Sequence, residues 1–306
     1  MRLDDKRASS NIENRRGERT PAGGGGGGPG LGLFAALAPL ILSKFGIVGI
    51  AIMAGLFLFL NFGGGLLNPP PPQTPATQQA QLPGGQQAQP SLQTNTDLFV
   101  ARVLATTEDT WGAIFAAEGQ RYPPPTLVFF SGGVRSACGA ASSQAGPFYC
   151  GADRRVYLDT SFFDELGRRF GAPGDFAAAY VIAHEVGHHV QEVTGIMRQF
   201  EALQKRARNR AEANQALVRL ELQADCFAGV WAARNRDILD RGDFEDGVRA
   251  AAAIGDDTLM KAAGSRVVPD AFTHGTSAQR VRWLTIGFEA GDPAACDTFS
   301  LAYERL

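Results

Sequence analysis

Histidine and cysteine are both scarce in this chain, with four of each among 306 residues. Neither sign of charge is in excess, because 29 Lys and Arg residues face 31 Asp and Glu residues, for a net charge of −2. This balance argues against a nucleic-acid partner, since binding to phosphates depends on an excess of positive charge. Residues 61–96 lack Lys and Arg altogether, and residues 45–62 lack charged residues of both signs.

The first third of the chain is not typical of a folded domain. Residues 1–30 are polar and rich in glycine, and we expect a disordered tail there because such a segment buries too little apolar surface to fold. Residues 31–67 form a hydrophobic segment, and the 18 uncharged residues of 45–62 have about the minimum length for a transmembrane helix. Residues 68–96, rich in Pro and Gln, are expected to form an extended linker.

Basic residues flank the apolar segment on one side only. Residues 1–44 contain seven of them: Arg2, Lys6, Arg7, Arg15, Arg16, Arg19 and Lys44. The positive-inside rule then places the N-terminus in the cytoplasm and the later residues outside. We therefore predict a single-pass protein of the inner (plasma) membrane, with a periplasmic domain and the lipid bilayer as a partner. A cleaved signal peptide fits less well, because the apolar stretch starts late and no small-residue cleavage site follows closely.

The cysteines predict disulfide bonds. An even number of cysteines in an exported domain favours two disulfides. Cys138 and Cys150 are the easiest pair, since they close a short loop rich in Gly and Ser, which leaves Cys226 for Cys296. Sequence alone allows three connectivities, and four reduced, buried thiols are the alternative.

Residues 97–306 have the patterns of a folded domain. Apolar residues at helical spacing predict a helix over 98–118, and short β-rich runs predict strands over 126–130, 148–150 and 155–158. Further helices are predicted over about 161–170, 176–194, 197–209, 211–235, 244–261 and 277–290. A small sheet followed by many helices indicates an α+β domain that is mostly helical.

Residues 184–188 read HEVGH. Two histidines four apart project from one face of a helix, so His184 and His188 can bind one zinc ion while Glu185 acts on the bound water. The context is helical, with Asp175 as a candidate N-cap and Gly195 as a candidate left-handed stop. The alternative is a chance match on a solvated helix. The next histidine, His189, points about 100° away from His188 and is expected to pack or form hydrogen bonds instead.

A third protein ligand is expected at a catalytic zinc site. Glu221 and Asp225 share one face of an apolar helix, where a pair of buried carboxylates is costly unless both are satisfied. Glu221 as a ligand, and Asp225 as the acceptor for a ligand imidazole N–H, would satisfy both. The alternative is an ordinary surface pair of acidic residues.

Three motifs together resemble the bacterial "putative neutral zinc metallopeptidase" family. They are HEVGHHVQ at 184–191, ELQADCFAG at 221–229 and HGTSAQR at 274–280. The first two are also similar to the HExxH and ExxxD pattern of gluzincin-type peptidases. The resemblance covers residues from about 1 to 300, and it implies a zincin-like fold, one zinc ion per chain, a peptide or protein substrate and one membrane span.

The resemblance also implies roles in catalysis. Glu185 would take a proton from the attacking water and pass it to the leaving nitrogen. Related peptidases steady the oxyanion with a His, Tyr or Arg after the third ligand, so His274 or Arg280 is the candidate here. His274 has an alternative role as the cap of the helix that begins near Ser277.

Two other functions are compatible with the same residues. One is a zinc amidase that acts on a non-protein or cell-wall link, and the other is a catalytically silent scaffold. The intact Glu185 favours an enzyme over a scaffold. By analogy with other proteins that bind extended peptides, residues 155–158 are a candidate edge strand for the substrate.

Overall fold

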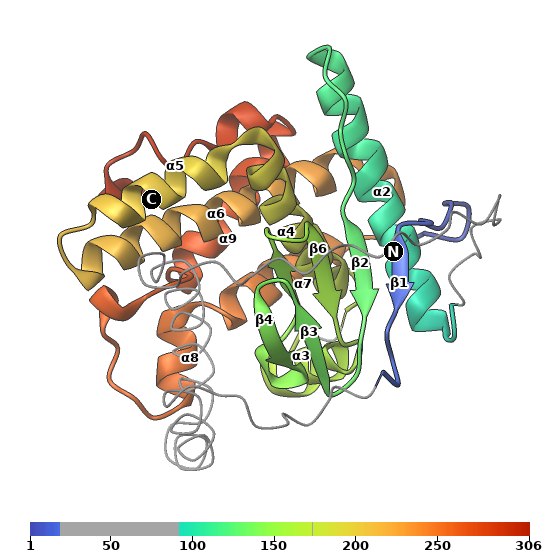
Figure 1. The fold of residues 1–306 in the computed structure, drawn as a ribbon, viewed down its shortest axis with the longest axis horizontal. Coiled ribbons are helices and arrows are strands. Elements are labelled where there is room, and N and C mark those ends of the chain that lie inside the picture. Colours follow the sequence, from blue (N-terminus) through green and yellow to red (C-terminus); the bar gives the residue numbers. More distant parts are fainter. Residues whose placement is uncertain (19–91, 173) are drawn as a thin grey trace, which may run out of the picture.

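The computed structural model describes residues 1–18, 92–172 and 174–306 (Figure 1). Its main sheet has four strands in the order β1-β2-β6-β5. These are β1 (Ile12–Asn14), β2 (Thr126–Phe129), β6 (Arg155–Leu158) and β5 (Phe148–Cys150). The first three are parallel, and β5 is antiparallel to β6 at the edge of the sheet.

Both faces of this sheet are buried, because alternate residues of a strand point to opposite sides. Leu127 and Phe129 of β2 join the main core beneath the helices. Val128 and Tyr157 face a smaller cluster beneath the hairpin of β3 (Gly133–Ser136) and β4 (Gly139–Ser142). The hairpin was not predicted from the sequence.

Helices make up most of the remaining domain. They are α2 (Asn95–Ala117), α3 (Ser161–Phe170), α4 (Asp175–Thr194), α5 (Ile196–Arg206), α6 (Arg210–Arg234), α7 (Asp243–Ala253), α8 (Asp256–Ala262) and α9 (Ser277–Ala290). In Figure 1, α4 lies between the sheet and α6, and α6 runs along α9. A Cβ atom on Gly287 would overlap the carbonyl oxygen of Cys226, so glycine allows α6 and α9 to touch through their backbones.

The predicted mostly helical α+β domain is confirmed, with one helix divided differently. The segment predicted as one helix over 244–261 forms α7 and α8, which are separated at Gly255. A side chain at Gly255 would collide with the backbone of Ser277, so the chain turns there against the start of α9.

The N-terminal segment, residues 1–18, belongs to the folded domain, and the prediction of a disordered tail over residues 1–30 is wrong for these residues. Ile12 pairs with Leu127 in the parallel register of β1 and β2. Leu3 and Ile12 are buried in the main core. Although polar overall, the segment places its few apolar side chains where the sheet and α2 cover them.

Buried carboxylates of α2 hold the N-terminal segment in place. Asp97 is fully buried, and Arg16 donates to both of its oxygens at 2.7 and 2.9 Å. Glu108 accepts hydrogen bonds from Asn11 at 2.8 Å and from Arg7 at 2.8 Å. Five of the seven basic residues predicted to orient a membrane span therefore form ion pairs within the described residues: Arg2, Lys6, Arg7, Arg15 and Arg16.

The predicted fold with a transmembrane helix, and the predicted membrane localisation, need correction. The proposed span at 45–62 lies in residues 19–91, outside the described residues, and none of the described helices has the length and apolar character to cross a bilayer. A single crossing would also put residues 1–18 and 92–306 on opposite sides, whereas β1 and β2 are hydrogen-bonded neighbours. The predicted linker over 68–96 likewise falls mostly outside the described residues, and residues 95 and 96 begin α2.

Both predicted disulfides are present. Cys138 joins Cys150 and so ties the β3–β4 hairpin to β5, and Cys226 joins Cys296. The alternative of four reduced thiols is therefore wrong. The second bond fixes the 3₁₀ helix η4 (Pro293–Cys296) against α6.

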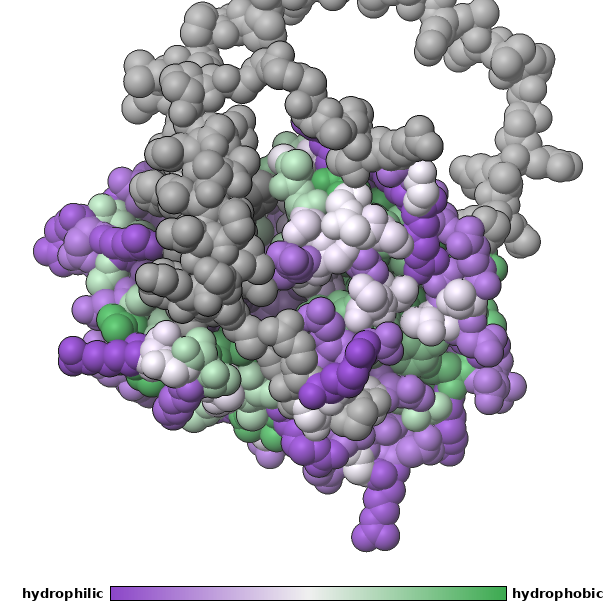
Figure 2. All heavy atoms as spheres, turned by 90° about the horizontal axis from the view of Figure 1, so that it is seen from below, coloured by the Kyte–Doolittle hydropathy of each residue, from purple (hydrophilic) through white to green (hydrophobic). Residues whose placement is uncertain are grey.

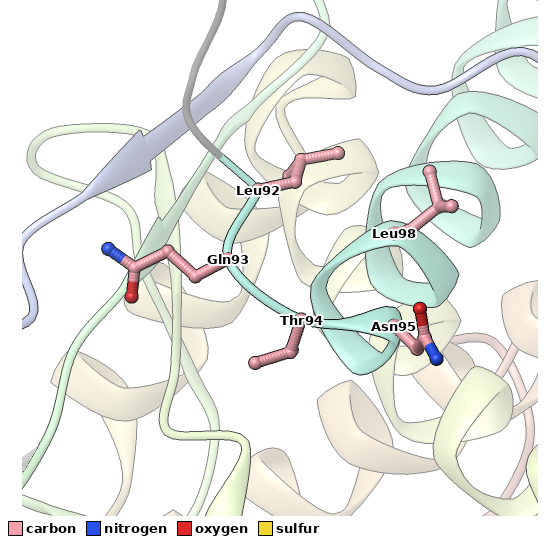
Figure 3. Close-up of a pocket in the computed structure, with 5 residues that line it drawn as sticks. All are labelled: Leu92, Gln93, Thr94, Asn95 and Leu98. Carbon is pink, nitrogen blue, oxygen red and sulfur yellow. The ribbon is translucent and has the colours of Figure 1, made fainter.

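Figure 2 shows one face, on which hydrophilic side chains alternate with small hydrophobic areas. Among the described large hydrophobic residues, Leu203 and Val268 are the exposed ones. A cavity of about 490 Å³ lies at the N-terminal end of α2. Figure 3 shows the residues that line it, none of which has a titratable side chain: Leu92, Gln93, Thr94, Asn95 and Leu98.

Candidate metal centre

Helix α4 carries the paired histidines. It begins after Gly174, which makes no side-chain cap, so the prediction of Asp175 as N-cap is wrong and Asp175 is the first helical residue. The helix ends as predicted at Gly195, whose φ of 82° is left-handed. His184 and His188 project from one face of this helix, and their ring centroids lie 4.8 Å apart.

Helix α6 brings Glu221 to the two rings. Gly187 allows the close approach of the helices, because a Cβ atom there would lie 3.1 Å from the carbonyl oxygen of Ala224. Glu221 Oε2 is 3.2 Å from Nε2 of His184, and Oε1 is 3.5 Å from Nε2 of His188. The three donor atoms lie within 4.8 Å of one another. The structure thus brings together the three predicted ligands.

Asp225 orients His184. Its Oδ1 is 2.8 Å from Nδ1 of His184, so the Nε2 atom is left to face Glu221. Arg280 from α9 donates to both oxygens of Asp225 at 2.9 Å, and the Tyr180 hydroxyl donates to Oδ1 at 2.5 Å. Arg280 is buried and committed to this ion pair, so the prediction of Arg280 as a candidate oxyanion donor is not supported by its position.

Gln191 holds the other ring and was not recognised from the sequence. Its Oε1 is 2.8 Å from Nδ1 of His188, which again leaves Nε2 facing Glu221. The available signal was spacing, because a residue three positions after a helical histidine lies on the same face.

The charges of the cluster are strongly coupled. Burial lowers the pKa of His184, but Asp225 and Glu221 outweigh burial and raise it to about 10. Burial also opposes ionisation of Glu221, yet His188 and His274 hold its pKa well below the usual value. The result is a carboxylate that stays charged among imidazoles. Two imidazole nitrogens, each on a ring whose Nδ1 atom is engaged elsewhere, and one carboxylate oxygen are a donor set that fits zinc.

Glu185 follows His184 in α4 but is not one of the three residues that converge at the candidate metal site. It is buried, and burial raises its pKa against the opposing effect of the two histidines. The backbone of Tyr149 in β5 acts in the same direction as the histidines and lowers this pKa. The strand at the edge of the sheet beside the centre is therefore β5, whereas the candidate at 155–158 is β6, which is paired on both sides.

His274 lies in the loop before α9 and is steadied by a carboxylate that sequence analysis missed. Asp256, at the start of α8, accepts from the backbone N–H groups of Thr273, His274 and Gly275 and faces Nδ1 of His274 at 3.3 Å. Burial lowers the pKa of His274, but Glu221 and Asp256 raise it overall. The alternative role as a helix cap is wrong, because Thr276 and Gln279 form the capping box of α9.

His189 stays apart from this cluster, as predicted. Its Nε2 is 2.6 Å from the carbonyl oxygen of Pro123, and its Nδ1 is 3.1 Å from the hydroxyl of Tyr149. Burial lowers its pKa to about 4, so the ring is neutral and serves to join α4 to β5.

Comparison with known proteins supports the resemblance. A family model described as "Putative neutral zinc metallopeptidase" matches residues 1–299. The uncharacterized protein YpfJ of Escherichia coli (strain K12) is 44% identical over 304 residues, which cover 98% of this chain and 99% of that protein. The uncharacterized protein Rv2575 of Mycobacterium tuberculosis (strain ATCC 25618 / H37Rv) is 38% identical over 252 residues, which cover 78% of this chain and 83% of that protein. No solved structure matches the chain. The chain therefore belongs to the "putative neutral zinc metallopeptidase" family, whose description implies a zinc cofactor.

Proposed function

We propose that this protein is a zinc-dependent peptidase that binds one zinc ion per chain and hydrolyses peptide bonds. The observation that carries the proposal is the convergence of His184 Nε2, His188 Nε2 and the Glu221 carboxylate within 4.8 Å. Catalytic zinc sites use three protein donors of these types and leave one position for water. A zinc ion held there supplies Lewis acidity, which makes water reactive near neutral pH and polarises a carbonyl group.

Glu185 is proposed as the general base. It adjoins the first ligand, and burial raises its pKa toward the range in which a carboxylate can accept a proton and return it. Its role is to take a proton from the attacking water and deliver it to the leaving nitrogen.

His274 is proposed as the donor that stabilises the developing oxyanion. The Thr273 hydroxyl at 2.9 Å and Asp256 at 3.3 Å engage Nδ1, so Nε2 is left as the donor, and the raised pKa favours the protonated ring. A fixed cationic donor of this kind stabilises charge that develops in the transition state. In this assignment Asp225 is not catalytic, because it acts by holding His184.

The substrate is proposed to lie along β5. This strand has one neighbour, β6, and it lies against α4, the helix that carries the candidate base. An extended peptide that adds a strand at this edge would place a scissile carbonyl beside the metal ligands.

The test uses the full chain and the variant Glu185→Gln. We expect one zinc ion per chain in both proteins, cleavage of a mixed peptide library by the wild type, and a rate about 10²–10⁴-fold lower in the variant. Glu245→Gln, at an exposed position of α7, is the matched control and should cleave at the wild-type rate. Wild-type rates from Glu185→Gln, or cleavage that persists after complete removal of zinc, would refute the proposal.

A further inference from the structure

Two glutamines connect the second histidine of the cluster to the backbone beyond it. Gln191 of α4 and Gln223 of α6 are 0% and 5% exposed. Gln191 Nε2 donates to the carbonyl oxygen of Leu220 at 2.7 Å and to Gln223 Oε1 at 3.0 Å. Gln223 Nε2 donates in turn to the carbonyl oxygen of Cys296 at 2.9 Å. No side-chain polar atom of the pair is left without a partner.

The direction of these hydrogen bonds is fixed by the backbone. A carbonyl oxygen can only accept, so the amide nitrogens of both glutamines must face Cys296 and Leu220. Gln191 then presents Oε1 to His188, and the Nδ1 atom of that ring must be the donor. A neutral imidazole with a proton on Nδ1 has its lone pair on Nε2, the atom that faces Glu221.

Cys296, the last acceptor in this series of hydrogen bonds, is held in place by a disulfide bond and by a neighbouring hydrogen bond. Cys296 is joined by a disulfide to Cys226, which lies on the same helix as Gln223. The hydroxyl of Thr298 donates to the carbonyl oxygen of Arg219 at 2.7 Å. The carbonyl oxygen of Cys296 is therefore fixed relative to α6, and it fixes the orientation of the Gln223 amide.

We propose that Gln191 and Gln223 are positioning residues that hold His188 as the Nδ1–H tautomer, with Nε2 ready to bind the metal. This inference rests on the proposed function, because it needs a metal at the cluster. It also assigns different supports to the two imidazole ligands. His184 is held by a charged carboxylate, and His188 is held by a neutral amide whose direction comes from a second amide.

The loss of zinc affinity should be larger for Gln191, which contacts His188 directly, than for Gln223, which contacts Gln191. Partners that orient a metal-bound histidine typically change metal affinity 10–100-fold when removed. We expect Gln191→Leu to weaken zinc binding by about this factor, because His188 then loses its acceptor. Gln223→Leu should weaken zinc binding less, because the Leu220 carbonyl still orients Gln191. Gln191→Glu keeps an oxygen opposite Nδ1 and should bind zinc more tightly than Gln191→Leu.

The experiment measures zinc affinity of the full chain by competition with a coloured chelator, with no substrate present. Asn235→Leu is the matched control, because Asn235 is a buried amide of the α6 C-cap that donates to Thr110 at 2.8 Å and to the Trp231 carbonyl at 2.8 Å. It should lower stability and leave zinc affinity unchanged. Nitrogen-15 spectra of the imidazoles should place the His188 proton on Nδ1 in the zinc-loaded wild type, and the chain's four histidines keep the assignment tractable.

The outcomes separate the two proposals. Folded Gln191→Leu with wild-type zinc affinity, or equal losses in Gln191→Leu and Asn235→Leu, would overturn the positioning role. If Gln191→Leu does not fold, Gln223→Leu decides, and an unchanged affinity there counts against the proposal. A wild type that binds no zinc would overturn the proposed function together with this inference. A wild type that binds zinc without cleaving peptides would leave the positioning role supported by the affinities alone.

Discussion

The metal-ligand cluster and the N-terminal segment both surround buried carboxylates, but they satisfy them differently. Asp97 accepts a bidentate pair of hydrogen bonds from Arg16 and further hydrogen bonds from Thr94 and the Gln93 backbone. Glu221, by contrast, faces two imidazole nitrogens at 3.2 and 3.5 Å, and no other hydrogen-bond donor among the described residues reaches it. A carboxylate that is paired with an arginine, which does not lose its proton, has a structural role. A carboxylate that faces only imidazole nitrogens, which can lose their protons and bind a metal, is suited to a metal site.

The two regions also differ in the origin of their partners. The cluster joins α4 to α6, and its histidine and carboxylate partners are about 40 positions apart, as for His184 and Asp225 with a separation of 41. The ion pair of Arg16 with Asp97 spans 81 positions, and residues 19–91 lie between the two partners. The metal ligands themselves therefore come from two helices close in sequence, while the buried ion pair of Arg16 joins segments on either side of residues 19–91.

The largest expected effect tests whether the N-terminal segment is structural. Arg16→Ala leaves Asp97 buried without its cation, and breaking such a pair costs about 3–5 kcal/mol. We expect the lower part of that range, because Thr94 and the Gln93 backbone still donate to Asp97. Urea unfolding of the full chain measures the loss.

Arg102→Ala is the matched control for this prediction. Arg102 also contacts the N-terminal segment, at 3.3 Å from Asp4. Because the Asp4 side chain is fully exposed, solvent screens this pair and we expect a much smaller loss than for Arg16→Ala. Equal losses for both variants would mean that the buried pair does not hold the segment. The double variant Arg16→Met/Asp97→Asn removes both charges and should recover much of the stability.

The same contrast explains what the sequence could and could not predict. The helix of His184 and His188 was predictable because local spacing sets which residues share a face, and Glu221 followed because a buried carboxylate needs a partner. Gln191 was missed because an amide three positions after a histidine is common on helices, so its spacing alone does not indicate a role at a metal site. Asp256 was missed because its partners lie in a loop, 17 to 19 positions away.

The N-terminal segment escaped prediction for a different reason. Its strand has three residues, too few to show an alternating pattern, and parallel pairing with β2 depends on contacts far along the chain. Its arginines suggested an orientation signal for a membrane span, because sequence alone does not reveal the buried acids of α2 that they neutralise. The composition of the N-terminal segment thus predicted disorder, whereas its pairing with β2 makes it the edge strand of the sheet.

An intermediate effect is expected at the metal cluster. A ligand that binds only the folded state stabilises it by about 2.7 kcal/mol at a free concentration 100 times its Kd. Zinc should therefore raise the unfolding free energy of the wild type by about this amount at that concentration, and a chelator should remove the gain. Glu221→Ala should show little response to zinc. Arg16→Ala should show the full response, since the two regions share no partner and their effects should add.

The smallest effect is the acid response of the Asp97 pair. Burial raises the pKa of Asp97, but Arg16, the Gln93 backbone and Thr94 lower it overall to below its usual value near 3.8. A lowered folded-state pKa contributes stability that is complete above the unfolded value and is lost as pH falls through the folded one. Unfolding curves at pH 5 and at pH 3 should therefore show a smaller advantage of the wild type over Arg16→Met/Asp97→Asn at the lower pH. An advantage that is unchanged or grows between these pH values would mean that Asp97 is not ionised in the folded protein, and the contrast with Glu221 would lose its basis.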